Sequence, residues 1–136
     1  MTRTPSKLTD RDYEALADFR AALRGFQAFS EDRAAEVGLK PQQHQALLAI
    51  RAAAGKATIG QLAERLALKP HTVSELVDRL EARSLIERQT SEDDRRKVHL
   101  IVAAKAELLL EAPSATHREE IRRIKPLLLE LLGRFG

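Results

Sequence analysis

Two short amphipathic helices joined by a tight turn constrain the fold of this chain more than any other feature. Thr58 and Gln61 have the spacing of a capping box, so the first helix should begin directly after Thr58. Pro70 suits the first position of the second helix, where no backbone N–H is needed. Each helix has one apolar stripe at spacings of three and four residues, which predicts one buried face. The stripes consist of Ile59, Leu62, Ala63 and Leu66, and of Val73, Leu76, Val77 and Leu80.

A charged β-hairpin is predicted directly after the second helix. Residues 85–89 and 97–102 read as short strands, the second with Val98, Leu100 and Val102 on one face. The segment 90–96 between them is polar throughout and is long enough to form a projecting hairpin tip. Helix, turn, helix and charged hairpin is the layout of a winged helix-turn-helix. We therefore expect a mainly α fold with a small β wing.

The polar residues of the second helix lie off its apolar stripe, with small polar residues near its beginning. A recognition helix places that end against base edges in the major groove of DNA. The candidate DNA-contacting residues of this helix are Lys69, Pro70, His71, Thr72, Ser74, Glu75 and Arg79. Those of the hairpin tip are Asp94, Arg95, Arg96 and Lys97.

Net charge by itself gives no argument for DNA binding. The whole chain of 136 residues carries a formal charge of +3, but residues 58–99 contain eight Lys or Arg and eight Asp or Glu, a difference of zero. The argument rests on placement, because the basic residues gather at the hairpin tip and at the start of the second helix.

The chain resembles the MarR family of bacterial transcription regulators. The resemblance is carried by IGQLAERLAL, HTVSELVDRLEARSLI and DDRRKVHLIVA, and residues 94–96 match the family's D-x-R wing signature. It covers nearly the whole chain, although the family usually has Gly where this chain has Ser84. The resemblance implies a two-fold dimer formed by the terminal helices. It also implies a pocket for small, often aromatic, anions between those helices and the DNA-reading part.

Residues 1–37 and 103–136 are predicted to be helical and to form the dimerisation region, with residues 38–102 as the winged helix-turn-helix. Thr9 should cap the first helix and Gly38 should end it. Pro113 and Pro126 should kink or split the C-terminal helical region.

Apolar seams run along both terminal regions. The N-terminal seam alone is equally compatible with a helix packed on its own domain. Seams at both ends would leave a large exposed apolar patch on a monomer, which favours a homodimer. The residues assigned to the interface are Leu16, Phe19, Leu23, Phe26, Ile121, Ile124, Leu128, Leu131 and Phe135.

The sequence lacks the usual constellations of catalysis. It has no Cys, and its four His residues do not have the spacing of metal ligands. The Asp93–Asp94 pair lies on a polar tip, where no pocket would tune a carboxylate. We expect no enzyme activity, no metal and no cofactor. The N-terminus has no apolar signal segment and no apolar run reaches membrane-spanning length, so we expect a cytoplasmic protein without membrane contact.

Two functions fit these features. The first is a dimeric, sequence-specific DNA-binding regulator, a repressor on an inverted-repeat operator that a small aromatic or anionic effector releases. The alternative is a winged helix that binds another protein, which would have no need for adjacent arginines at the hairpin tip. The candidates for effector contact are Tyr13 and His44, although a lone His on a helix is more often simply packed.

Overall fold

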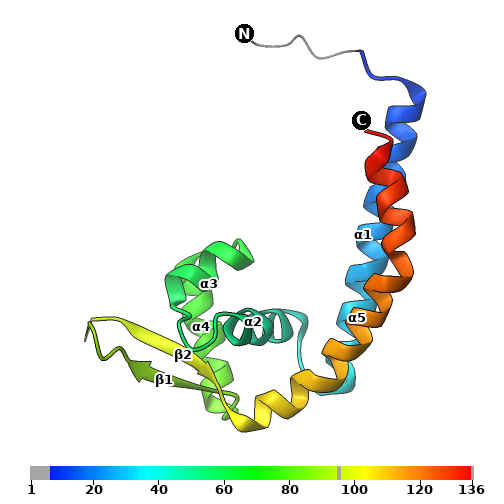
Figure 1. Ribbon diagram of the computed structural model, residues 1–136. Coiled ribbons are helices and arrows are strands. Elements are labelled where there is room, and N and C mark those ends of the chain that lie inside the picture. Colours follow the sequence, from blue (N-terminus) through cyan, green and yellow to red (C-terminus); the bar gives the residue numbers. More distant parts are fainter. Residues whose placement is uncertain (1–6, 95, 136) are drawn as a thin grey trace.

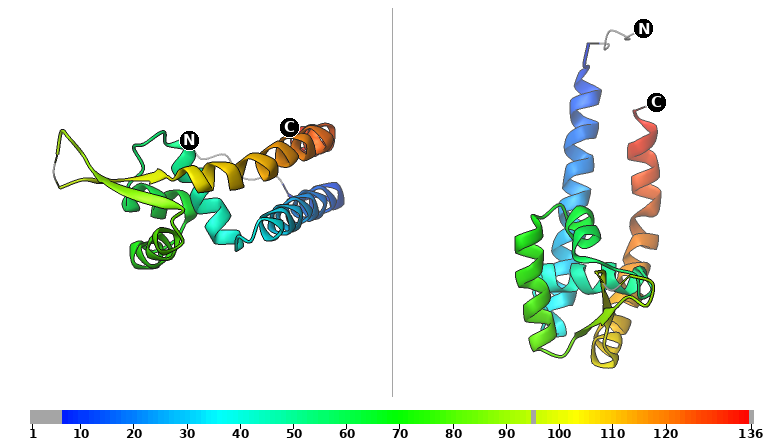
Figure 2. Two further views of the ribbon diagram at one scale, coloured as in Figure 1. Left: turned by 90° about the horizontal axis from the view of Figure 1, so that it is seen from below. Right: turned by 90° about the vertical axis from the view of Figure 1, so that its left-hand side faces the viewer.

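The computed structural model describes residues 7–94 and 96–135. The described elements are α1 (Asp10–Glu36), α2 (Pro41–Ala52), α3 (Ile59–Leu66), α4 (Pro70–Ala82), β1 (Ile86–Thr90), β2 (Val98–Val102) and α5 (Ala104–Gly133). Figure 1 shows α1 and α5 side by side as a long antiparallel stalk, with α2, α3 and α4 gathered at one end as a head. The β1–β2 hairpin extends from the head away from the stalk, as Figure 2 shows. The mainly α fold with a small β wing is confirmed.

The head is built around one apolar core that buries the stripes of both short helices. All four stripe residues of α4 are buried, as are Leu62 and Ala63 of α3, while Ile59 and Leu66 pack at the edge of the core. Each fully buried Val or Leu side chain contributes roughly 1.5–3 kcal/mol. This burial fixes the rotation of α4, so that its polar side faces outward. The same core also includes Leu47, Ile50, Leu85, Ile86, Leu100, Ala34, Ala106 and Leu110.

The predicted helix caps are present. Thr58 and Gln61 form the capping box of α3, with Gln61 N–H donating to Thr58 Oγ1 at 3.2 Å. Thr9 and Asp12 form a second capping box at the start of α1. Gly38, with φ of 75°, is the left-handed residue that follows α1. The ends of these helices are therefore set by local side-chain chemistry that the sequence displays.

Ser84 adopts the left-handed conformation that Gly usually takes after such a helix, with φ of 61°. The Ser84 N–H donates to Glu81 O at 2.9 Å, and the Leu85 N–H donates to Leu80 O at 3.0 Å. These two bonds form a Schellman motif, and Leu80 and Leu85 are both fully buried beside it. The backbone strain at Ser84 is thus offset by satisfied carbonyls and by apolar burial.

The hairpin pairs β1 and β2 antiparallel, from Ile86 opposite Val102 to Thr90 opposite Val98. Its strands begin one residue later than predicted because the preceding N–H groups are used elsewhere: Leu85 N–H in the helix cap, and Lys97 N–H in a turn to Asp94 O. Val98 lies toward the tip, beyond the core, and is 42% exposed.

Helix α5 runs without interruption from Ala104 to Gly133, so the prediction that the prolines split it is wrong, whereas the alternative of a kink near Pro113 agrees with its shape (Figure 1). Each proline removes only one helical N–H donor, and the ring of Pro113 is buried. The Thr116 hydroxyl donates to Ala112 O at 3.0 Å, one residue before Pro113. Figure 1 shows α5 bending between its yellow beginning and orange middle, the part that contains Pro113. No helix in the described ranges is both long and apolar enough to cross a membrane.

Candidate nucleic-acid interface and hinge pocket

The outward side of α4 carries the residues that were predicted to contact DNA. The helix begins at Pro70 as predicted, after the extended residue Lys69. Six of the seven candidates are exposed and Ser74 is half-buried, so together they form one accessible surface. We call this surface the recognition face: Lys69, Pro70, His71, Thr72, Ser74, Glu75 and Arg79.

The beginning of α4 is open to an anion. No side chain caps it, since Lys69 makes no side-chain hydrogen bond to the helix. The first N–H groups of a helix have no partner within the helix, and the helix dipole places partial positive charge at this end. A DNA phosphate is one anion that fits such a position.

Part of the recognition face is already paired. His71 Nε2 lies 3.3 Å from Glu75 Oε1, one turn along the helix. Protonated His71 would neutralise Glu75, whereas neutral His71 leaves a carboxylate on a surface that would face phosphates. Glu75 is thus an acidic residue of the recognition face whose negative charge a neighbouring side chain, His71, can offset.

Arg88 of β1 joins the hairpin to the recognition helix. Its guanidinium makes an ion pair with Asp78, and its Nε lies 3.3 Å from Glu81 Oε2. Both acidic residues belong to the second half of α4. The base of the wing is thereby held against α4 at a defined angle. The sequence had not singled out Arg88, because its partners are ten and seven residues away and only the fold brings them together.

The wing tip is a turn rather than extended chain. Lys97 N–H donates to Asp94 O at 3.0 Å, and the Asp94 carboxylate accepts from the backbone N–H of Arg96 at 3.0 Å. Asp94 and Arg96 therefore lie in a turn and not in an extended strand. Arg96 and Lys97 are exposed, whereas Arg95 lies outside the described residues.

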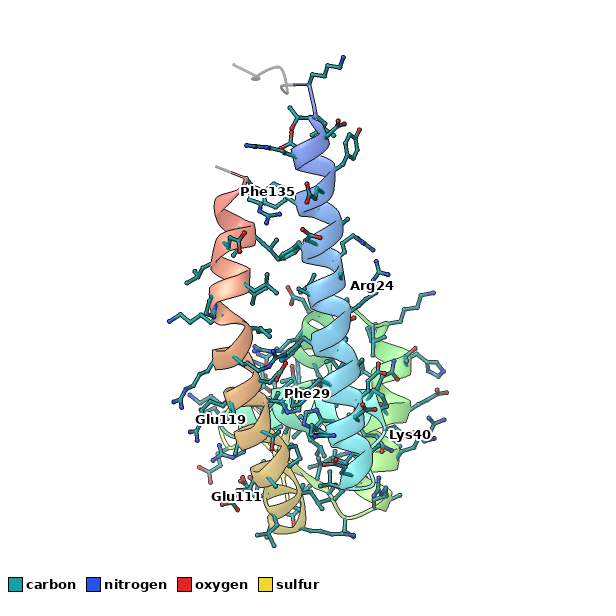
Figure 3. The ribbon with its side chains drawn as sticks, turned by 90° about the vertical axis from the view of Figure 1, so that its right-hand side faces the viewer. Arg24, Phe29, Lys40, Glu111, Glu119 and Phe135 are labelled. Atoms are coloured by element: carbon teal, nitrogen blue, oxygen red, sulfur yellow. The ribbon has the colours of Figure 1, made fainter. Side chains whose placement is uncertain are left out.

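The residues predicted at a subunit interface differ in how far their side chains are exposed to solvent. Leu16, Leu23, Ile121 and Phe135 are exposed, and Phe19, Phe26, Ile124 and Leu128 are half-buried. Leu131 is only 1% exposed, as is Ala15 of the other stalk helix. Part of the predicted seam is therefore used to pack α1 on α5 within one chain. Figure 3 shows the side chains of these two helices along the whole stalk.

A cavity of about 740 Å³ lies where α1, α2 and α5 meet. We call this cavity the hinge pocket, because it lies between the stalk and the head. Its volume suits a small organic molecule. Of the two predicted effector contacts, His44 lines the pocket, while Tyr13 is 60% exposed near the beginning of α1 and does not. The apolar lining comes from Phe26, Pro41, Leu48 and Ile121, and the charged lining from Glu31, Arg118 and Arg122.

Two imidazole rings are stacked at this pocket. His44 and His117 have ring centroids 5.2 Å apart and planes inclined by 19°. His44 is buried, and its Nε2 has no hydrogen-bond partner among the described residues. Burial, together with the charge of His117, lowers the pKa of His44 below its ordinary value.

Gln43, the neighbour of His44, connects this region to the recognition helix. Its Oε1 accepts from the Lys40 backbone N–H and from the Arg83 guanidinium, both at 3.0 Å. Arg83 is the residue that ends α4. A displacement of α2 at the pocket would therefore act directly on the end of α4.

Comparison with known proteins agrees with this arrangement. Residues 37–97 match the model of the MarR family. Over 119 residues the chain is 26% identical to YsmB of Bacillus subtilis strain 168, an uncharacterised HTH-type transcriptional regulator, with 85% of this chain and 81% of YsmB covered. Apo MarR of Escherichia coli shares the fold, with a TM-score of 0.68 at 16% identity over 84% of this chain and 93% of MarR.

The matched segment, residues 37–97, is similar to the MarR family. Another solved structure with the same fold is a mutant of Staphylococcus aureus MepR bound to an oligodeoxyribonucleotide. It has a TM-score of 0.67 and 21% identity, with 96% of this chain and 100% of MepR covered. The MarR family match begins directly after α1 and covers the head, β1 and the wing tip, while the structural likeness extends over the stalk.

Several residues that shape the pocket were not identified from the sequence. Leu48 is 46% exposed and lines the pocket. His117 lies 73 residues from His44 in the chain, and no spacing pattern relates them. A bend in α5 and the crossing of α2 bring them together, and no local motif predicts that these two helices meet there.

Proposed function

We propose that this protein is a homodimeric repressor that binds an inverted-repeat DNA operator and is released by a small amphipathic anion. The observation that carries the proposal is the recognition face of α4, which lies outward on a rigid core beside a wing with exposed basic residues. The MepR mutant of the same fold, bound to an oligodeoxyribonucleotide, supports it.

The mode of DNA contact follows from the geometry of the head. The beginning of α4 enters the major groove, where Thr72 and Ser74 can bond to base edges or phosphates and Arg79 reaches further along the helix. The uncapped end of α4 faces phosphate. Arg96 reaches toward the adjacent minor groove, where narrow A·T-rich sequence concentrates negative potential.

The dimer is supported by the two unlike sides of the stalk. On one side, Arg134 of α5 bonds to Asp18 of α1 at 3.2 Å. The two stalk helices are antiparallel and touch along one line. Starting from that line, residues that are rotated in the same direction about their own helix axes lie on the same side of the stalk. Leu16 and Leu23 of α1, and Ile121 and Leu132 of α5, are displaced oppositely to that ion pair and are exposed. This apolar side is where a second copy of the chain would pack.

A two-fold dimer with one recognition helix per subunit requires an inverted repeat, with half-site centres about 10 bp apart. Selection of random DNA fragments by the purified protein, followed by footprinting, tests this expectation. A single asymmetric protected half-site would argue against the dimeric mode. If no fragment is enriched, the head does not read DNA sequence, and a protein-binding role replaces this proposal.

The contribution of the wing is tested by Arg96→Ala. The change should weaken binding more on operators with A·T-rich flanks than on others, because the guanidinium is expected in the minor groove. Fluorescence anisotropy on flank-swapped operators measures the difference. Arg24→Ala, which removes an exposed arginine from α1 of the stalk (Figure 3), is the matched control and should leave the affinity unchanged. Equal binding by Arg96→Ala and unaltered protein would exclude the wing from the interface.

The ligand class follows from the lining of the hinge pocket. Apolar side chains from all three helices would cover an aromatic or aliphatic body, while Arg118, Arg122 and the two imidazoles favour an acidic head. Such a ligand would bridge α2 and the stalk, and Gln43 would pass the displacement to Arg83 at the end of α4. Release follows if the ligand binds the DNA-free arrangement more tightly than the DNA-bound one.

A further inference from the structure

The stacked imidazoles of the hinge pocket are held from several directions. His44 projects from α2 and is 3% exposed, and its ring lies nearly parallel to that of His117 from α5. Phe26 and Phe29 of α1 meet His117 edge-on, with ring centroids at 5.9 and 5.6 Å. Three helices therefore fix the pair at one wall of the cavity.

The hydrogen bonds of His117 assign its protons. Nδ1 contacts the carbonyl of Pro113, which can only accept, so Nδ1 carries a hydrogen. Nε2 lies 2.8 Å from the Ser30 hydroxyl, which donates to it when the ring is neutral and accepts from it when the ring is charged. His117 thus has partners in both protonation states. His44 Nε2 has none among the described residues.

Charged groups face the pair from α1 and α5. Glu31 of α1 lines the same cavity, and Arg33 stacks over Phe29 at 5.1 Å from the ring centroid. Arg118 and Arg122 of α5 also line it, and both lie within ion-pair distance of Glu119, at 3.8 and 3.0 Å. From α2, the cavity is lined by His44 with the uncharged residues Pro41, Gln45 and Leu48. The groups named here are three arginines and two glutamates, so the surroundings of the pair favour an anionic ligand.

We propose that the His44–His117 pair takes up one proton when an aromatic carboxylate binds in the hinge pocket, so that the pocket binds its ligand more tightly as pH falls. The inference rests on the ligand role of the pocket proposed above. Two charged imidazoles at stacking distance repel each other, and a buried imidazole with an unpartnered nitrogen resists charge. A carboxylate beside the pair compensates one added positive charge and supplies the missing acceptor.

The direction of the pH dependence follows from the two states. In the ligand-free protein, burial and the charge of His117 lower the pKa of His44. The carboxylate raises that pKa again, because an adjacent negative charge favours the imidazolium. Between these two pKa values the free pocket is uncharged at His44 and the complex is protonated. Within that window, affinity should increase up to about tenfold for each unit by which pH falls.

Isothermal titration calorimetry with benzoate tests the proposal on the full chain. Titrations at several values from about pH 5.5 to 8, each in two buffers of different ionisation enthalpy, count the protons taken up on binding. The benzoate carboxyl has a pKa of about 4 and stays ionised throughout. We expect uptake to be greatest, approaching one proton, midway between the two pKa values and to fall on either side. Benzamide, the neutral isostere, should show no uptake.

Variants assign the proton to the pair. His44→Gln with His117→Gln in one chain should abolish proton uptake, whereas His71→Gln and His99→Gln, on the recognition helix and the wing, should leave it unchanged. His117→Gln alone should move the uptake to higher pH, because His44 loses the neighbouring charge. Circular dichroism confirms folding, and if the double variant does not fold, the calorimetry of the unaltered protein still decides.

Each result bears on one proposal. Benzoate binding without proton uptake, uptake that persists in the folded double variant, or no benzoate binding would each overturn the inference. None of these touches DNA binding, which is measured separately by anisotropy without benzoate. Conversely, if the protein takes up a proton with benzoate but binds no DNA, the inference about proton uptake stands and the proposed function as a DNA-binding regulator is refuted.

Discussion

Ser84 shows how a single residue can depart from a preferred type without changing the fold. Left-handed backbone disfavours residues with a Cβ by roughly 1–2 kcal/mol each. The position is nevertheless held, because the helix-ending hydrogen bonds and the burial of Leu85 depend on it. Ala67, with φ of 55° after α3, makes a similar compromise. The head therefore carries local strain at both helix ends of its DNA-reading unit.

Ser84→Gly should raise the free energy of unfolding by about 1 kcal/mol, since glycine takes a positive φ without strain. Urea denaturation followed by circular dichroism measures the change. Ser74→Gly, in the middle of α4, is the control and should lower stability, because there glycine only adds unfolded-state entropy. An unchanged or reduced stability of Ser84→Gly would show that the serine is not strained.

His44 should make stability depend on pH. Its pKa is lowered in the folded protein, whereas in the unfolded chain it protonates near 6.5. The unfolded state therefore binds more protons as pH falls below about 6.5, and stability present above that pH is lost toward the lowered pKa. Urea midpoints at successive pH values should decline in this range for the unaltered protein. His44→Gln should decline less, and the control His99→Gln should follow the unaltered protein. Parallel slopes for all three would contradict the assignment.

At the scale of elements, the relation of the wing to the recognition helix depends on Arg88. The β1–β2 hairpin reaches the core through Ile86 and Leu100, whereas the described residues of its outer half are joined by backbone pairing and a turn. The ion pairs of Arg88 with Asp78 and Glu81 hold its base to α4. Exposed ion pairs contribute little stability, about 0–1 kcal/mol, so this contact serves orientation more than folding.

Arg88→Ala should reduce DNA affinity while lowering the free energy of unfolding by less than about 1 kcal/mol. Its effect should not add fully to that of Arg96→Ala, because both act through the position of the wing. A double-mutant cycle by anisotropy measures the coupling. Arg123→Ala, which breaks the Arg123–Glu120 pair within α5, is the matched control. Full additivity would mean that Arg88 does not orient the wing.

At the scale of the whole molecule, the stalk combines an internal contact with an exposed apolar side. Ala15 and Leu131 are buried where α1 and α5 pack, so the chain holds its own stalk together. The exposed leucines on the other side have no partner in the described part of the chain. A second copy with the same surface would cover them by two-fold symmetry.

Leu132→Glu should disrupt the dimer without unfolding the chain, since Leu132 is 55% exposed in the single subunit. A dimer would bury two unpaired carboxylates, which should raise its dissociation constant at least about a hundredfold. Light scattering coupled to gel filtration measures the mass. Leu108→Glu alters an exposed leucine of α5 outside the stalk's apolar side and should remain dimeric. A folded monomer of the unaltered protein at micromolar concentration would refute the dimer.

The sequence by itself determined those features that depend on neighbours within a few residues. The helix cap at Thr9, the capping box at Thr58, the start of α4 at Pro70 and the buried stripe of α4 are all as predicted. Each follows from side chains three or four residues apart, which meet on one helix in any context. The exposed polar side of α4 then follows from the burial of its opposite side.

Tertiary structure alone decided the rest. Pro113 and Pro126 lie within one continuous helix, because packing against α1 and the head outweighs the loss of two hydrogen bonds. The Arg88 contacts and the His44–His117 stack join residues on different elements. The spacing of residues within one element does not predict which elements will pack together. Long-range contacts are set by how the apolar faces of all helices are buried together, and that is a property of the whole chain.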